Sequence, residues 1–181
     1  MTLHPIEIEE ALSTFSILID TREQPTERAL RRYDSFGVPY SKAKLDYGDY
    51  AYQYELNGKR MFDPSASVKC PAVVERKMNL DELAGCFTHD RDRFEREFER
   101  AKANNARVYL LVENGNFEGI LNRKYRSKFH PNAFMASVMA WQARYDFHLI
   151  FCKAESSGRL IREILYRELK ERLACCEYEQ R

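Results

Sequence analysis

Two side chains of opposite charge stand two residues apart at the end of a short apolar run. Glu75 and Lys77 follow Ala72-Val73-Val74, with Arg76 between them. In a β-strand, side chains two residues apart lie on the same face, so Glu75 and Lys77 would point together and Arg76 would point away. An acid and an amine held side by side are costly unless they share a metal or an anionic substrate. The pattern is typical of half of a phosphodiesterase site.

Further carboxylates lie at the ends of other strand-like stretches upstream. Asp20 ends an apolar run, Glu23 follows it closely, and Asp49 begins a tyrosine-rich stretch. Mg²⁺ prefers oxygen ligands, and one or two carboxylates with waters are enough to hold it. Such a metal activates water and neutralises charge on a phosphate. We therefore expect Asp20, Glu23, Asp49 and Glu75 to bind a divalent metal, with Lys77 orienting or helping to deprotonate the water.

The order of these motifs resembles a known family. Ile19-Asp20-Thr21-Arg22-Glu23, Gly48-Asp49-Tyr50 and Val74-Glu75-Arg76-Lys77-Met78-Asn79-Leu80-Asp81 closely resemble the nuclease domain of the XPF family of structure-specific DNA endonucleases. That family belongs to the PD-(D/E)xK nuclease superfamily. Asp90-Arg91-Asp92-Arg93-Phe94 is similar to the basic-aromatic segment that follows. The resemblance covers residues 15–146, which is most of the chain.

The resemblance implies an endonuclease that uses Mg²⁺ or Mn²⁺ to hydrolyse phosphodiester bonds in branched DNA, such as flaps and forks, during repair or recombination. Family members usually act as dimers, so a homodimer or a partner subunit is expected. The alternative is a non-catalytic DNA-binding subunit that needs a partner nuclease. Every motif position is occupied here, which favours the enzyme. The tandem helix-hairpin-helix domain of many members is not visible in this sequence.

Several of these residues also have simpler interpretations. Asp20 is suited to cap a helix, Glu23 to be solvated, and Asp49 to occupy a turn after glycine. Asp81 either supports the active site, as the resemblance implies, or stabilises the first turn of its helix through the dipole. Arg76 is expected to tie its strand to neighbouring carboxylates, in support of the active site.

Local basic clusters are the candidate DNA surface. Arg22 and Arg93 belong to the family motifs. The densest cluster is Arg123–His130, where aromatic residues interleave with cations, so that Arg123, Lys124 and Arg126 are candidates for phosphate contacts. Cations supply phosphate affinity and aromatic rings stack on unpaired bases. An ordinary solvated loop is the alternative for this cluster.

The pattern along the chain alternates strands and helices, which predicts an α/β fold: a central mixed β-sheet flanked by α-helices, as in a restriction-endonuclease-like core. The expected domains are an N-terminal arm (1–14), a nuclease domain (15–153) with a hairpin and loop insertion (55–71), and a C-terminal helix (154–181) packed on the core or on a partner. The strands expected are 15–20, 40–45, 49–54, 59–62, 72–77, 107–113 and 147–152. The helices expected are 26–33, one capped by Asn79, 90–104, 117–121, one starting at Pro131 and one capped at Ser156-Ser157.

Composition sets outer limits on these expectations. The chain has 181 residues and a net charge of +1, so any DNA surface must be local. No apolar run approaches the length of a membrane span, and the polar N-terminus does not read as a signal peptide. The five cysteines lack a Cys-x-x-Cys pair and are expected to be reduced thiols of a cytoplasmic or nuclear protein.

Overall fold

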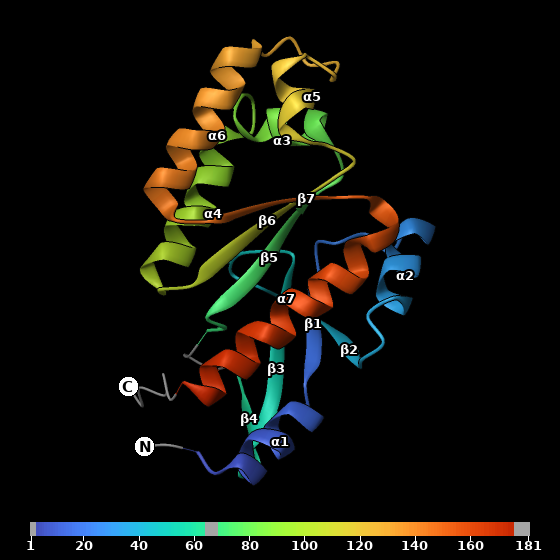
Figure 1. Ribbon diagram of the computed structural model, residues 1–181, viewed down its shortest axis with the longest axis vertical. Helices are drawn as coiled ribbons and strands as arrows, with labels where there is room; N and C mark the ends of the chain where they lie inside the picture. Colours follow the sequence, from blue (N-terminus) through green and yellow to red (C-terminus); the bar gives the residue numbers. More distant parts are fainter. Residues whose placement is uncertain (1–2, 64–68, 176–181) are drawn as a thin grey trace.

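The computed structural model describes residues 3–63 and 69–175 and confirms the α/β fold (Figure 1). A sheet of seven strands runs in the order β2-β1-β3-β5-β6-β7, with β4 paired to β3. The strands are β1 (Ser16–Asp20), β2 (Tyr40–Ala43), β3 (Tyr50–Leu56), β4 (Lys59–Met61), β5 (Ala72–Lys77), β6 (Arg107–Glu113) and β7 (His148–Cys152). The helices are α1 (Pro5–Ser13), α2 (Glu27–Asp34), α3 (Leu80–Cys86), α4 (Arg91–Ala103), α5 (Phe117–Leu121), α6 (Pro131–Tyr145) and α7 (Ala154–Ala174).

The sheet is mixed, and its strand directions bring the candidate residues to one edge. β5, β6 and β7 are parallel, while β3 is antiparallel to both β1 and β5. The last residues of β1 and β5 therefore lie at the same edge as the first residue of β3. Asp20 and Lys77 end β1 and β5, Asp49 immediately precedes β3, and Glu113 ends β6 beside them.

Helices cover both faces of the sheet (Figure 1). On one face α4 packs against β6, and the Trp141 ring of α6 contacts Phe87, Phe94 and Phe98 at centroid distances of 5.1, 5.2 and 5.8 Å. On the other face α7 crosses β3, β5 and β6 and contacts α1 and α2. Trp141 is buried, as are the α7 residues Ile161, Leu165 and Leu169. Trp141 and these three α7 residues therefore belong to the hydrophobic core.

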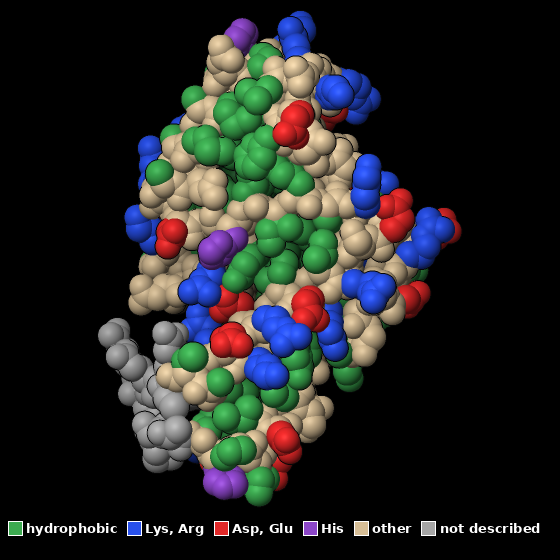
Figure 2. Space-filling model, in the orientation of Figure 1, with side chains coloured by type: hydrophobic (Ala, Val, Ile, Leu, Met, Phe, Trp, Pro, Cys, Tyr) green, Lys and Arg blue, Asp and Glu red, His purple; other side chains and the backbone are tan. Residues whose placement is uncertain are grey.

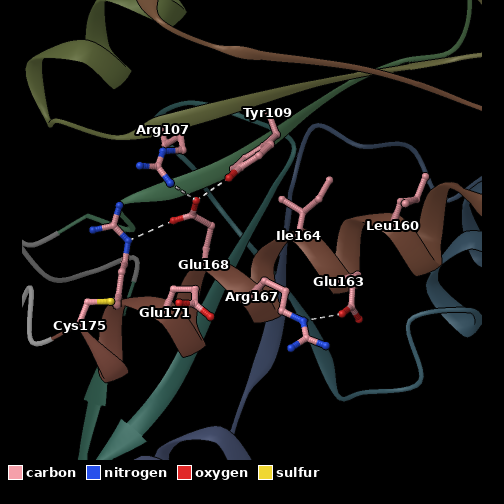
Figure 3. A pocket seen from close by; sticks show the side chains of 10 residues that line it. Arg107, Tyr109, Leu160, Glu163, Ile164, Arg167, Glu168, Glu171 and Cys175 are labelled. Atoms are coloured by element: carbon pink, nitrogen blue, oxygen red, sulfur yellow. Dashed lines mark hydrogen bonds and ion pairs between the residues drawn. The ribbon is translucent and has the colours of Figure 1, made fainter.

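A buried acid fixes α7 across the sheet (Figure 3). Glu168 Oε1 accepts hydrogen bonds from Arg107 Nη1 at 2.6 Å and from the Tyr109 hydroxyl at 2.5 Å. Oε2 accepts another from Arg172 Nε at 3.3 Å. These residues line a groove of about 540 Å³ on the α7 face of β6. The buried acid Glu168 already accepts hydrogen bonds from cationic and hydroxyl donors. The groove is therefore interpreted as part of the surface along which α7 packs on the sheet.

Most element boundaries predicted from the sequence agree with the structure within two residues, and the exceptions have local causes. The expected N-terminal arm contains helix α1, where the His4 side chain accepts a hydrogen bond from Ile6 N and Glu7 accepts one from His4 N. Helix α7 begins at Ala154, before the expected serine cap, and Ser157 is buried in it. The 55–71 insertion contains the β3–β4 turn, but residues 64–68 lie outside the described part. Within residues 3–63 and 69–175, no helix is both long and apolar enough to cross a bilayer.

Candidate active site

Glu75 and Lys77 point together, as the strand period predicts. Lys77 Nζ lies 2.6 Å from Glu75 Oε1, and both side chains are buried. They face α3 and α4, where Lys77 Nζ sits 5.1 Å from the centroid of the Phe94 ring. Glu75 Oε2 is buried and has no hydrogen-bond partner among the described residues. A buried oxygen of this kind is costly unless a further donor or a cation reaches it.

Asp49 reaches the same place from the start of β3. Gly48 precedes it with φ +73°, a left-handed conformation that favours glycine. Asp49 N donates to Val74 O at 2.9 Å, and Asp49 Oδ2 accepts a hydrogen bond from Arg76 N at 2.8 Å. These two bonds hold the Asp49 carboxylate against the end of β5, beside Glu75.

The electrostatics of this trio show an excess of buried negative charge. Burial, and then the negative charge of Glu75, raise the pKa of Asp49 to about 7. Burial also raises the pKa of Glu75, although Lys77 opposes the shift. Burial lowers the pKa of Lys77, but attraction to Glu75 and Asp49 raises it to a value above the ordinary one. Lys77 is therefore a cation throughout the physiological pH range.

Asp20 lies at the same sheet edge, but both of its oxygens already accept protein hydrogen bonds. Oδ1 accepts from Arg22 N at 2.8 Å and from Arg22 Nε at 2.6 Å, and Oδ2 accepts from Leu45 N at 2.7 Å. The carboxylate is fully buried. In this structure Asp20 organises the turn after β1 and holds Arg22.

Glu23 belongs to a separate cluster on the opposite face of β5. Its Oε1 accepts hydrogen bonds from Arg32 Nη1 and from the Tyr50 hydroxyl, both at 2.9 Å, and lies 3.5 Å from Arg76 Nη2. Glu113 completes the cluster, 3.3 Å from both Arg32 Nε and Arg76 Nη1. Arg76 thus points away from Glu75 and ties β5 to β6 and α2, as the strand pattern predicts.

Two acids in these clusters were not singled out from the sequence. Glu113 looks like the polar end of an apolar strand, and nothing local distinguishes it. Glu97 lies on a helix rich in charged residues, yet its Oε1 is 3.4 Å from Arg22 Nη2 and its side chain is 13% exposed. Its spacing of three residues from Phe94 is the one signal, because it places both side chains on the face of α4 that looks toward β5.

The remaining predicted residues lie around this centre. Asp81 accepts backbone hydrogen bonds from Arg126 at 2.7 Å and Ser127 at 2.9 Å, which links α3 to the basic cluster. Arg22 is 58% exposed and lies between Asp20 and Glu97. Arg93 is 71% exposed at the start of α4, with Asp90 as an ion-pair partner at 3.9 Å. Arg123 and Lys124 are exposed in the connection from α5 to α6.

Asp49 and Glu75 offer carboxylate oxygens of the kind that a divalent metal binds. Across residues 3–63 and 69–175, no group of three His, Cys, Asp or Glu side chains is arranged to hold a metal ion. The two carboxylates of Asp49 and Glu75 are adjacent, both have raised pKa values, and one oxygen of Glu75 lacks a partner. One or two carboxylates with waters and substrate phosphates are the usual protein ligands of Mg²⁺. The residues present fit such an ion.

Comparison with known proteins identifies a family model and solved structures that this chain resembles. The ERCC4 domain matches residues 19–164. The fold is similar to that of XPF from Aeropyrum pernix, with a TM-score of 0.57 and 20% identity over 84% of this chain and 61% of that one. The structure of XPF from Aeropyrum pernix in complex with DNA gives a TM-score of 0.58 and 24% identity over 86% of this chain and 65% of that one.

This chain spans less than two thirds of the length of the XPF chains it matches. A search of curated protein sequences found no match. The family match nevertheless covers more than half of the chain and contains every motif described above from Ile19 to Asp81. The chain therefore belongs to the ERCC4 domain family and has the fold of an XPF nuclease domain.

Proposed function

We propose that this protein is a DNA endonuclease that depends on Mg²⁺ or Mn²⁺ and cuts branched DNA such as flaps and forks. One observation carries the proposal: Glu75 interacts with Asp49 and with the Lys77 cation, and its buried Oε2 has no hydrogen-bond partner among the described residues. Asp49 and Glu75 would hold the metal. When bound there, a divalent cation supplies Lewis-acid activation of phosphate and lowers the pKa of water.

Lys77 has a defined part in this chemistry. Hydrolysis adds a water oxygen to phosphorus and breaks one P–O bond, so negative charge builds on the phosphoryl oxygens. Because its pKa is raised, Lys77 keeps its proton, and its ammonium orients the water and stabilises that charge. Glu75 aims the ammonium through the 2.6 Å contact, and Phe94 packs beside it.

Arg76 and Asp20 support the site without reaching the substrate in this proposal. The backbone N–H of Arg76 fixes Asp49, and its guanidinium is held by Glu113. Asp20 holds Arg22, whose exposed guanidinium is a candidate phosphate contact together with Arg93. Glu23 as a further metal ligand stays a prediction.

Branched DNA as the substrate, and a homodimer or partner subunit as the working form, are inferred from the family resemblance. The DNA complex of XPF from Aeropyrum pernix supports DNA as the ligand class. Roles in repair or recombination rest on the resemblance alone. The mass of the purified chain in solution, with and without fork DNA, checks the oligomeric state.

The activity test uses labelled flap, fork, single-stranded and plain duplex DNA with Mg²⁺, Mn²⁺ or EDTA. The variants are Asp49→Ala and Lys77→Ala, with Asp92→Ala as the control because Asp92 is an exposed acid on α4. We expect metal-dependent cutting of branched DNA by the wild type and the control only. Binding without cutting by a metal-loaded wild type would favour the non-catalytic DNA-binding subunit. Equal cutting by all variants would place the site elsewhere.

A further inference from the structure

The connection between α5 and α6 is a basic surface segment, which we call the basic arm (Arg123–His130). It contains four lysine and arginine residues, and no aspartate or glutamate occurs from Gly119 to Tyr145. In Figure 1 this connection lies at the same end of the molecule as α3 and α5, and in Figure 2 lysine and arginine side chains gather at that end. The chain as a whole is nearly neutral, so this concentration of cations is a local feature.

Aromatic side chains pack inside the basic arm, and its cations are exposed to solvent. Tyr125 and Phe129 each pack on Phe134 at a centroid distance of 5.3 Å, and the Tyr125 hydroxyl donates to Phe129 O at 2.8 Å. The residues between and beside them, Lys124, Arg126 and Lys128, are exposed. Aromatic residues therefore anchor the arm, and the cations alternate with them on the solvent side.

One carboxylate bonds to the backbone of this arm. Asp81 Oδ1 accepts hydrogen bonds from the backbone N–H groups of Arg126 at 2.7 Å and Ser127 at 2.9 Å, while Oδ2 lies 3.5 Å from Arg126 Nε. The Arg126 side chain is otherwise 91% exposed. Asp81 stands in the first turn of α3, four residues after Lys77. It thus connects the arm to the strand and helix that carry the catalytic lysine.

The charge of Asp81 argues against a purely electrostatic role. An acid beside a phosphate-binding surface lowers phosphate affinity, because it repels the ligand and neutralises a cation. The helix end that Asp81 occupies is already capped, since Asn79 Oδ1 accepts from Glu82 N at 2.9 Å and Glu82 Oε2 accepts from Met78 N at 2.6 Å. What Asp81 adds is the pair of backbone bonds to the arm.

We propose that the basic arm binds backbone phosphates of DNA next to the active site, and that Asp81 is the residue that positions it. The proposal rests on DNA being the ligand, as in the function proposed above. It makes the last acid of the Glu75–Asp81 motif a positioning residue that couples the site of cutting to a site of backbone contact.

The test compares three variants in a binding assay with fluorescent fork DNA in EDTA, across a series of salt concentrations. Asp81→Ala removes the acceptor, Asp81→Asn keeps an oxygen that both N–H groups can reach, and Glu118→Ala removes an exposed acid on α5 just before the arm. Asp81→Ala and Glu118→Ala change the net charge equally. They differ in whether the arm loses its anchor.

The positioning role and a pure charge effect predict opposite signs. If Asp81 positions the arm, Asp81→Ala weakens binding by roughly tenfold and lowers the salt slope by about one to two phosphate contacts. Asp81→Asn then stays near the wild type, and Glu118→Ala binds as tightly as the wild type or more tightly. Binding by Asp81→Ala that equals or exceeds that of Glu118→Ala would overturn the proposal.

A second measurement does not depend on DNA. In Asp81→Ala, the backbone amides of Arg126 and Ser127 should exchange hydrogen faster, and trypsin should cut faster within the arm, while the rest of the protein is unchanged. Unchanged hydrogen exchange and proteolysis would overturn the positioning role of Asp81 but not the binding of phosphates by the arm. A wild-type protein that binds no DNA in the first assay would instead overturn the proposed function, and the phosphate-binding role with it.

Discussion

Lys77 Nζ and Glu75 Oε1 form a buried contact of 2.6 Å at the end of β5, while the other oxygen of Glu75 has no partner among the described residues. Lys77 thus satisfies only one of the two carboxylate oxygens of Glu75. Removal of one member of a buried ion pair is more costly than removal of both, because the remaining charge is left without compensation.

Lys77→Met should therefore destabilise the protein by about 3–5 kcal/mol, and the double variant Glu75→Gln/Lys77→Met by clearly less. Urea unfolding of the metal-free proteins gives both values. Additive losses in the double variant would show that the two side chains do not interact in solution. Both variants should lack cleavage, so the stability cycle is independent of the activity.

The raised pKa of Asp49 makes the stability of the folded protein depend on pH. Its pKa is raised from 3.8 to about 7 in the folded protein, first by burial and then by Glu75. Between these two pH values the folded state binds a proton at Asp49 that the unfolded state has lost. This contribution to the free energy of unfolding is therefore present below about pH 4 and is lost as the pH rises to about 7.

The variant Asp49→Asn removes this contribution but keeps an oxygen for the N–H of Arg76. Relative to the wild type in EDTA, Asp49→Asn should gain about 4 kcal/mol of stability between pH 4 and pH 8. Urea unfolding at both pH values measures it, with Asp92→Asn as the control. A difference between Asp49→Asn and wild type that does not change with pH would mean that Asp49 titrates normally.

Gly48 and Gly58 offer a matched pair of positions. Both have positive φ, +73° and +72°, but a Cβ atom at Gly48 would lie 2.7 Å from Val73 Cβ, whereas nothing lies within 4 Å at Gly58. Gly58→Ala should cost about 1 kcal/mol, from the backbone conformation alone. Gly48→Ala should cost more and should reduce cleavage, because the Cβ pushes the Asp49 turn away from β5.

The two glycine variants are compared by thermal or urea unfolding and by fork cleavage under saturating Mg²⁺. Gly58→Ala should cut like the wild type. Equal losses of stability in the two variants would show that the contact with Val73 relaxes freely, and full cleavage by Gly48→Ala would show that the turn does not set the position of Asp49.

The sequence was most informative where chemistry follows from local spacing. The two-residue strand period correctly separated Glu75 and Lys77 from Arg76, and the hairpin signal at Asn57-Gly58 correctly placed β4. These features depend on residues close in the chain, where backbone geometry leaves few alternatives. The family motifs then gave the order of the strand ends before any three-dimensional contact was known.

The structural features that the sequence does not predict depend on contacts between segments that are distant in the chain. Glu113 and Arg32 are 81 residues apart in the chain, and the sheet order brings them together. Helix α1 is not predicted because it has only nine residues, of which Ala11 alone is buried, so packing on β3 and α7 defines it more than periodicity does. Asp81 was left between helix stabilisation and site support because its partners at Arg126 and Ser127 lie in a loop without regular structure.

The last prediction concerns Glu23, which the family motif suggests as a metal ligand and the structure places in an ion-pair cluster. Its Oε1 is 2.9 Å from Arg32 Nη1 and lies across β5 from Glu75. In Glu23→Gln, the two arginines of the cluster keep only Glu113 as a charged partner. The variant should therefore lose about 1–3 kcal/mol of stability, as expected for a buried polar group whose partner is weakened.

Mn²⁺ affinity separates the two roles of Glu23 without any need for cleavage. Titration calorimetry should give the same Mn²⁺ affinity for Glu23→Gln as for the wild type, and a loss of at least about tenfold for Glu75→Gln, because only the latter removes an oxygen from the pair with raised pKa values. Equal losses of affinity in both variants would instead make Glu23 a metal ligand. In that case the side chain would have to leave Arg32 and Tyr50 when the metal binds.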